Sequence, residues 1–265
     1  MPAVMATQAL HDKHQRWLTI LLIPFMSCNA RVPVFVLLIS AFFSQYAATV
    51  LFILYLIGIS VAAISGLIFS LFFFKRREPI VEITLTPYRV PQLRPTLKKM
   101  WAEASDYLKK ITNVVLVASA IIWALNAFPL NKEGATEHES YLEQAGKFLS
   151  PVFAPLGFDW KMTTALITGV VAKETVVSTL SVLYTGEEDE ILLGERLQNE
   201  PIFSTPTVAA FLIFILLYFP CIAVVVCIYK VTKNVGFTLL SVCYTTGIAW
   251  ILAFLTQKIS VLFLI

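Results

Sequence analysis

Long apolar segments alternate with short polar segments along this chain, and the apolar segments carry few charged residues. A helix needs about 20 apolar residues to cross the hydrocarbon core of a bilayer. Open sheet is excluded there, because its unpaired backbone groups would have no hydrogen-bond partner. The pattern therefore predicts an all-α, polytopic transmembrane helix bundle of about six spans, some of them interrupted. The predicted spans are Trp17–Phe43, Ala47–Phe74, Leu108–Phe128, Met162–Tyr184, Val208–Tyr229 and Phe237–Leu255.

Composition narrows the class of protein. Of the 265 residues 58% are hydrophobic and 14% charged, whereas soluble domains have about 45–50% and about 25%. A soluble enzyme is therefore excluded, and a net charge of +3 is too small for a nucleic-acid binder. The sequence contains no GxxxxGK[ST] phosphate loop, so we expect no nucleotide hydrolysis by this chain. All four cysteines lie in apolar stretches, which argues against a secreted disulfide framework.

Charged residues predict the orientation. Nine lysines and arginines lie between Lys75 and Lys110, which places that loop in the cytoplasm. The acidic 129–161 segment then faces outward, and six spans put both termini in the cytoplasm. The 185–205 loop is also acidic, yet this count places it inside. Within the basic loop, Thr96 is predicted to cap an interfacial helix that runs to Leu108 and lies on membrane lipid.

Two apolar segments contain proline beside cysteine. Pro24 and Pro33 interrupt the first span, and Pro220 stands next to Cys221 in the fifth. The polar residues of the first interruption are Ser27, Cys28, Asn29 and Arg31. Paired broken helices are how many transporters build a midplane ion site. The alternative is a proline kink with a buried cysteine that packs as a small apolar group.

The fourth segment carries adjacent opposite charges, Lys173 and Glu174. Charges at membrane depth are rare and usually functional. Hydroxyl side chains follow one helical face of this segment: Thr164, Thr168, Thr175 and Thr179. The pattern predicts a face that lines a cavity, and the alternative is a buried ion pair with a structural role.

These residues predict a metal-ion path. Thiolates favour transition metals, so Cys28, Cys221 and Glu174 are candidate ligands for passing Fe²⁺, Zn²⁺ or Mn²⁺. Ser27, Asn29, Thr168 and Thr175 are candidate ion-path residues, and Arg31 and Lys173 are candidate structural charges. No permanently bound cofactor is expected.

The motifs resemble the membrane portion of the ferrous iron transport protein B family. The resemblance rests on the Pro24–Pro33 stretch (PFMSC-x-AR-x-P), on the second gate around Gly169–Glu174, and on Leu216–Cys221. Met1–Leu10 also resembles the end of a first gate. The implied division is 1–74 (end of the first gate and two spans), 75–107 (basic loop with the interfacial helix), 108–184 (second gate) and 185–265 (C-terminal spans).

The resemblance implies a bacterial inner-membrane Fe²⁺ importer in which Cys28 and Cys221 line the ion path. It also implies that GTP acts only through a GTP-binding domain that precedes the membrane portion in the family, in cis or as a separate chain. We therefore expect a fragment of a longer protein, with a homo-oligomer among its assemblies. Two alternatives stay open: a gate-type transporter of nucleosides or other small solutes, and a non-transporting membrane partner of a separate GTPase or pore subunit.

Overall fold

The computed structural model describes residues 2–10, 12–72, 92–127, 140–185, 190–218 and 220–264, and all regular structure in these ranges is helical, as predicted. The helices are α1 (Pro2–Ala6), α2 (Lys13–Leu22), α3 (Val32–Phe42), α4 (Ala47–Phe72), α5 (Leu93–Ala127), α6 (Tyr141–Phe153), α7 (Trp160–Val171), α8 (Thr175–Thr185), α9 (Glu190–Asn199), α10 (Thr205–Leu217), α11 (Ile222–Thr232) and α12 (Val235–Leu264). Single 3-10 turns are η1 (Thr7–Ala9), η2 (Ile23–Phe25), η3 (Asn29–Arg31), η4 (Ser44–Tyr46) and η5 (Ala154–Leu156).

The first apolar segment is divided into α2 and α3, so the interruption predicted there is confirmed. Between the two helices the chain passes through η2, an extended stretch and η3. Pro24 lies in the 3-10 turn η2 and Pro33 lies in the first turn of α3. At both positions the missing proline N–H costs no helical hydrogen bond.

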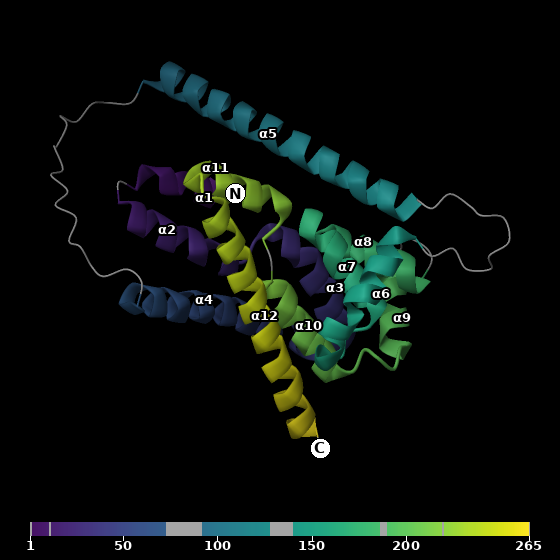
Figure 1. Cartoon of the computed structure of the whole chain (residues 1–265). Helices are drawn as coiled ribbons and strands as arrows, with labels where there is room; N and C mark the ends of the chain where they lie inside the picture. The colour runs from purple at the N-terminus through teal and green to yellow at the C-terminus, as the bar shows by residue number, and fades with distance from the viewer. Residues whose placement is uncertain are drawn as a thin grey trace.

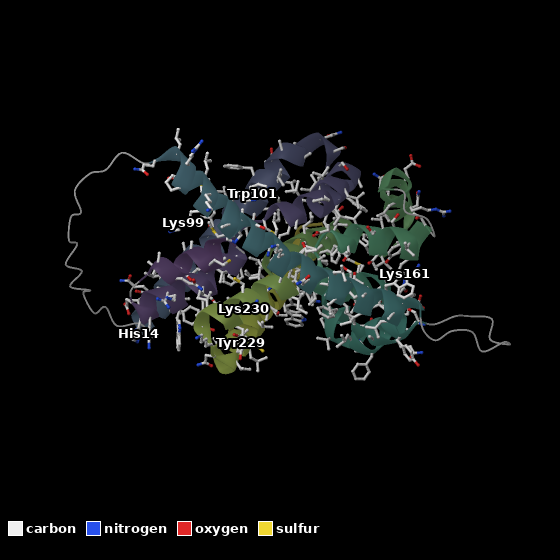
Figure 2. The ribbon with its side chains drawn as sticks, turned by 90° about the horizontal axis from the view of Figure 1, so that it is seen from above. His14, Lys99, Trp101, Lys161, Tyr229 and Lys230 are labelled. Carbon is white, nitrogen blue, oxygen red and sulfur yellow. The ribbon has the colours of Figure 1, made fainter. Side chains whose placement is uncertain are left out.

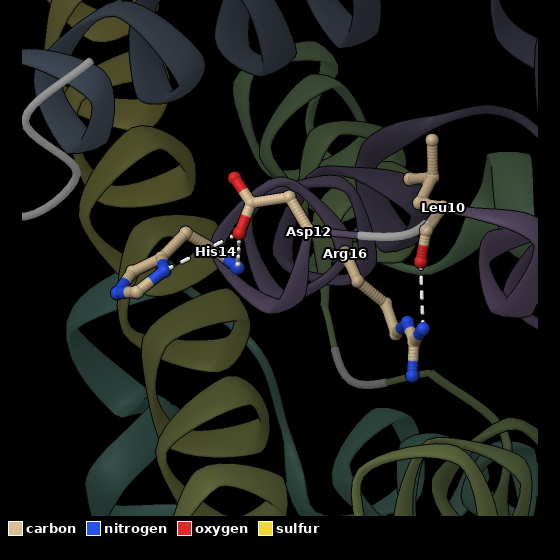
Figure 3. A network of polar contacts seen from close by, with 4 residues as sticks. All are labelled: Leu10, Asp12, His14 and Arg16. Atoms are coloured by element: carbon tan, nitrogen blue, oxygen red, sulfur yellow. Dashed lines mark hydrogen bonds and ion pairs between the residues drawn. The ribbon is translucent and has the colours of Figure 1, made fainter. Parts of the chain in front are cut away.

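Polar contacts fix the beginning of α2 (Figure 3). The Asp12 side chain accepts a hydrogen bond from the backbone N–H of His14 at 3.0 Å, and His14 Nδ1 lies 3.4 Å from the same oxygen. Arg16 Nη2 donates to the carbonyl of Leu10 at 2.6 Å. The backbone N–H of His14 lowers the pKa of the Asp12 carboxyl below its ordinary value of 3.8, so the cap carries its charge at neutral pH.

The fifth apolar segment is also divided, as its proline predicts. α10 ends at Leu217 and α11 begins at Ile222, so the break includes Tyr218, Pro220 and Cys221. α10 is buried from Pro206 to Leu217 except for the half-buried Ala209, and it packs mainly against α12. The broken helix therefore runs through the centre of the bundle.

The fourth apolar segment is a helical hairpin, and the prediction of one continuous helix over Met162–Tyr184 is wrong. α7 ends at Val171 and α8 begins at Thr175. Thr168 Oγ1 lies 2.9 Å from Thr179 Oγ1, whereas an unbroken helix would separate these residues by about 16 Å. The Tyr184 hydroxyl donates to Asp159 Oδ2 at 2.6 Å, which joins the end of α8 to the residue that caps α7. The α7–α8 hairpin therefore enters the bundle and returns to the face it came from.

Contacts between helix ends define two opposite faces of the bundle (Figure 1). At the face we call the α2 face, the ring centre of Trp17 in α2 lies 4.8 Å from the ring centre of Phe237 at the beginning of α12. At the face we call the α9 face, Phe42 at the end of α3 stacks on Phe203, which follows α9. The open ends of the hairpin belong to the α9 face, because Gln198 of α9 and Ala41 of α3 are hydrogen-bonded beside them.

This arrangement corrects the predicted sidedness of the loops. The 129–161 and 185–205 segments were expected on opposite faces, but the hairpin places Asp159 and Tyr184 side by side. α12 begins at the α2 face and runs toward the α9 face, where Trp250 Nε1 donates to the carbonyl of Val152 at 3.1 Å. α12 therefore ends on the face opposite its beginning, and the hairpin removes one of the crossings counted in predicting the sides of the termini; their orientation to the cytoplasm stays a prediction.

Four helical stretches in the described residues are long and apolar enough to span a bilayer: Lys13–Phe42, Ser44–Leu71, Thr205–Thr232 and Val235–Leu262. The other two predicted spans contribute shorter apolar helices, Leu116–Asn126 and Thr175–Thr185. Multi-pass insertion in a membrane follows from these lengths.

The predicted interfacial helix and the third span form one helix, α5, which runs along one side of the bundle (Figure 1). Thr96 lies inside α5 and does not cap it, since its hydroxyl donates to the carbonyl of Gln92 at 2.8 Å. Figure 2 shows Lys99 and Trp101 on the first part of α5, where both side chains are exposed. An exposed tryptophan beside lysines suits the headgroup level of a membrane.

Candidate functional site

The three breaks meet at one cavity of about 580 Å³. Its walls come from the α2–α3 break, the tip of the α7–α8 hairpin, the α10–α11 break and the beginning of α1. We call it the thiol cavity. Its lining residues are Pro2, Ala3, Ile23, Pro24, Met26, Ser27, Cys28, Ala30, Arg31, Val171, Ala172, Lys173, Glu174, Pro220, Cys221, Ala223 and Val224.

The thiol cavity brings together the three predicted metal ligands. Cys28 and Cys221 are free thiols, and both line the cavity with Glu174. Within the described part of the chain, no three His, Cys, Asp or Glu side chains gather closely enough to hold a metal ion. The three residues therefore surround a common space without forming a closed metal cage.

Each of these three residues directly precedes a helical turn. Cys28 precedes η3, Glu174 precedes α8 and Cys221 is the N-cap of α11. The N-terminus of a helix carries a partial positive charge that favours an anion nearby. The local geometry therefore suits a carboxylate and metal-bound thiolates at these positions.

Arg31 holds the first break together from inside. Arg31 is 2% exposed. Its Nη2 donates to the carbonyl of Pro24 at 3.1 Å, and its Nη1 donates to the carbonyl of Met26 at 3.3 Å. A broken helix leaves such carbonyls without a backbone partner. The buried cation replaces the helical hydrogen bonds that the break removes.

Lys173 connects two breaks that lie 45 residues apart in the chain. Its side chain is 3% exposed, and Nζ donates to the carbonyl of Tyr218 at 3.3 Å. The same nitrogen lies 4.0 Å from the centre of the Tyr218 ring, close enough for a cation–π contact. Lys173 therefore binds the tip of the hairpin to the α10–α11 break and makes no ion pair with Glu174.

The hydroxyl and amide candidates are divided between places. Ser27 lines the thiol cavity, whereas Asn29 is exposed outside its lining. Thr168 lines a separate cavity between the hairpin, α5 and α6. Thr175 lines neither of the two, and its hydroxyl donates to the carbonyl of Ala172 at 2.7 Å. Pro24 and Pro220 line the thiol cavity, and Pro33 does not.

Tyr218 is the residue of this site that the sequence analysis did not select. Its side chain is 3% exposed, and its hydroxyl has no hydrogen-bond partner among the described residues. Gly169 leaves room for that hydroxyl, since a Cβ there would lie 2.4 Å from it. The signal in the sequence was the position of Tyr218 two residues before Pro220, inside a break.

Comparisons with known proteins bear on this site. A family model described as "Nucleoside recognition" matches residues 108–234, and one described as "Ferrous iron transport protein B C terminus" matches residues 51–102. No solved structure matches the chain.

Curated relatives align along nearly the whole chain. It is 37% identical to the Fe(2+) transport protein A/Fe(2+) transporter FeoB fusion protein of Porphyromonas gingivalis, over 99% of this chain and 36% of the relative. It is 35% identical to the Fe(2+) transporter FeoB of Campylobacter jejuni, over 98% of this chain and 44% of the relative. It is 34% identical to the Fe(2+) transporter FeoB of Methanocaldococcus jannaschii, over 98% of this chain and 39% of the relative. The chain thus spans less than half the length of each of these relatives.

Proposed function

The chain belongs to the C-terminal membrane portion of the ferrous iron transport protein B family, and on that premise we propose that it carries Fe²⁺ across a bacterial inner membrane through the thiol cavity. The observation that carries the proposal is the meeting of three helix breaks at one cavity with two free thiols and a carboxylate. Relatives named as Fe(2+) transporters support Fe²⁺ as the ion.

Cys28, Cys221 and Glu174 are the proposed metal-contacting residues, and Ser27 extends the lining. Binding Fe²⁺ requires the thiolate form of a cysteine, so the loaded cavity gains negative charge from its ligands. Arg31 and Lys173 offset that charge once the ion leaves. An open set of ligands with cations beside it suits an ion that must be released.

We propose that the α2 face is cytoplasmic and the α9 face is outward. α4 ends at the α2 face and is followed in the sequence by the basic residues, and Lys13, Lys230 and Lys233 lie on helix ends at the same face. From the acidic 185–205 segment, the described helix α9 belongs to the α9 face. This orientation satisfies the excess of basic residues expected in the cytoplasm, and it puts the end of α12 outward.

We also propose that a GTP-binding domain acts with this chain, in cis or as a separate subunit, and that the chain itself hydrolyses no GTP. The proposed energy source is thus separate from the ion path. Thr168, Thr175 and Asn29 stay candidate path residues outside the lining of the thiol cavity.

Anaerobic Fe²⁺ uptake into proteoliposomes tests the proposal. The Cys28→Ser, Cys221→Ser double variant should lower initial uptake by at least about tenfold, because a hydroxyl replaces each soft ligand. Cys243→Ser is the matched control, since Cys243 is an exposed cysteine outside the cavity. Equal uptake by the double variant and the control would refute the thiol path.

The volume of the cavity favours one second candidate, a nucleoside or similar small solute. About 580 Å³ lies within the range of pockets for small organic ligands, and one matching family model is described by nucleoside recognition. Competition separates the two: Cd²⁺ should inhibit Fe²⁺ uptake through thiols, while uridine or adenosine should leave it unchanged. The reverse pattern would favour the solute. A non-transporting partner would show no uptake in any variant.

A further inference from the structure

A second cavity, of about 150 Å³, lies between the α7–α8 hairpin, the beginning of α6 and the end of α5. We call it the hydroxyl cavity. Its lining residues are Ile122, Asn126, Leu142, Glu143, Thr164, Thr168, Ser178, Thr179, Val182 and Leu183. Six of these ten side chains carry oxygen, and none carries sulfur.

The donor set suits a hard cation. Carboxylate, amide and hydroxyl oxygens are the ligands of Mg²⁺, Mn²⁺ and hydrated Fe²⁺, whereas thiolates select softer ions. Glu143 is the only charged residue of the lining. It is half-buried, and within the described residues it makes no ion pair. The volume of about 150 Å³ is well above the roughly 10–15 Å³ that one water needs, so a cation can enter with part of its hydration shell.

Close packing of α6 on α7 holds Glu143 in place. Gly146, one helical turn after Glu143, lies so close to Thr164 that a Cβ there would be 1.9 Å from Thr164 Oγ1. The N-terminal turn of α6 is capped by Ser140, whose hydroxyl accepts from the backbone N–H of Glu143 at 3.2 Å. The backbone that carries Glu143 is therefore held beside α7, and Glu143 lines the same cavity as Thr164 and Thr168.

The two cavities share the hairpin. Thr168 of the hydroxyl cavity is one turn before Ala172 of the thiol cavity, and Ser178 is one turn after Glu174. The hydroxyl cavity lies nearer the open ends of the hairpin, which belong to the α9 face. An ion entering from that face would meet oxygen ligands before thiols.

We propose that the hydroxyl cavity is a second cation site, which takes a partly hydrated divalent ion on Glu143 and the hydroxyls of the hairpin before the ion reaches the thiol cavity. The passage of the ion on to the thiol cavity rests on the proposed function, whereas the binding of a divalent ion in the hydroxyl cavity does not. At this site hydroxyl oxygens replace part of the hydration water of the ion. Both Fe²⁺ and a hard ion such as Mn²⁺ should therefore bind there.

Binding of two probe metals to the purified chain in lipid nanodiscs tests the inference. Mn²⁺, followed by the loss of its free paramagnetic resonance signal, reports the hydroxyl cavity, and Cd²⁺, followed by calorimetry, reports the thiol cavity. Glu143→Gln, which keeps the shape of the side chain, should weaken Mn²⁺ binding by about tenfold and leave Cd²⁺ binding unchanged. Glu195→Gln, at an exposed glutamate of α9, is the matched control.

The Cys28→Ser, Cys221→Ser variant should show the reverse pattern, with Cd²⁺ binding lost and Mn²⁺ binding kept. Glu143→Gln should also raise the Fe²⁺ concentration needed for half-maximal uptake. If neither Glu143→Gln nor Ser178→Ala changes Mn²⁺ binding, or if the chain binds no Mn²⁺, the second site is refuted. If Glu143→Gln weakens Mn²⁺ binding but the cysteine variant changes neither Cd²⁺ binding nor Fe²⁺ uptake, the proposed thiol path is refuted and the second site is supported.

Discussion

The first and second breaks of the bundle are held by different kinds of contact. In the α2–α3 break, Arg31 donates to carbonyls five and seven residues away in its own segment. At the tip of the α7–α8 hairpin, Lys173 donates to a carbonyl 45 residues away. One break is a local structure marked by two prolines, and the other depends on tertiary contact and has no proline between Trp160 and Thr185.

This difference indicates where movement can occur. A break stabilised by its own residues keeps its shape when neighbouring helices shift. A break that depends on Lys173 and Tyr218 changes when α10 and α11 move relative to the hairpin. Under the proposed function, the hairpin tip is therefore the part of the thiol cavity that would open and close around an ion, with Lys173 as its link to the opposite wall.

The hairpin itself gives the largest expected effect, an all-or-none labelling pattern. Gln144→Cys on α6 and Glu195→Cys on α9 precede and follow the hairpin, and both positions are exposed. In intact cells an impermeant maleimide should label both, while Lys230→Cys at the end of α11 (Figure 2) should react only after permeabilisation. Labelling of positions 144 and 195 from opposite sides would show a single crossing helix in place of the hairpin.

Replacing the long-range anchor should strongly affect transport and only weakly affect stability. Lys173→Met removes the hydrogen bond and the ring contact with Tyr218, so Fe²⁺ uptake should fall by about tenfold or more, equivalent to about 1.4 kcal/mol in the barrier. The melting temperature should change little, because removing a buried charge also removes its desolvation cost.

Lys161→Met is the matched control for that change. Lys161 lies at the open end of the same hairpin, 4.5 Å from the centre of the Tyr184 ring. It too would lose a lysine–tyrosine contact, but outside the thiol cavity, so uptake should change by less than about twofold. Equal losses in the two variants would mean that the hairpin needs lysine–ring contacts in general and no specific anchor at its tip.

The comparison of breaks also explains how much the sequence predicts. Prolines and clustered polar residues act locally, so the interruptions at Pro24–Pro33 and Pro220 were predicted with the right residues. The all-helical fold and the long apolar helices α4 and α12 follow from segment length. The hairpin was missed because the contacts that fold it, Tyr184 to Asp159 and Lys173 to Tyr218, join residues 25 and 45 positions apart. Glu143 was missed for the same reason, since only α7 and α8 folded together give it hydroxyl neighbours.

Small residues on α4 allow a test of the contact that supports the local break. Gly58 and Gly66 pack against the first segment: a Cβ on Gly58 would lie 3.0 Å from the carbonyl oxygen of Phe25, and one on Gly66 would lie 3.0 Å from the side chain of Leu22. Gly58→Ala should lower the free energy of unfolding by about 1–3 kcal/mol, because a backbone oxygen cannot move away.

Gly247→Ala on α12 is the control, because the added Cβ would have no described atom within 4 Å beyond its chain neighbours and the backbone of its own helix. Both substitutions improve helix propensity equally, by up to about 1 kcal/mol. The difference between their thermal shifts, measured in one detergent, therefore isolates the contact of α4 with the break. Equal shifts would mean that α4 can move away from η2 at no cost.

The smallest expected effect lies at the exposed start of α2, far from both cavities. The pKa of Asp12 is lowered in the folded chain, chiefly by the backbone N–H of His14. A lowered folded-state pKa adds stability above the ordinary value of 3.8, and that stability is lost as the pH falls through the folded-state value. The difference in melting temperature between the parent and Asp12→Asn, whose amide still caps the helix, should therefore be constant from pH 5 to neutrality and shrink only below about pH 4. A difference that already shrinks between neutral pH and pH 5 would refute the lowered pKa of Asp12 as its cause.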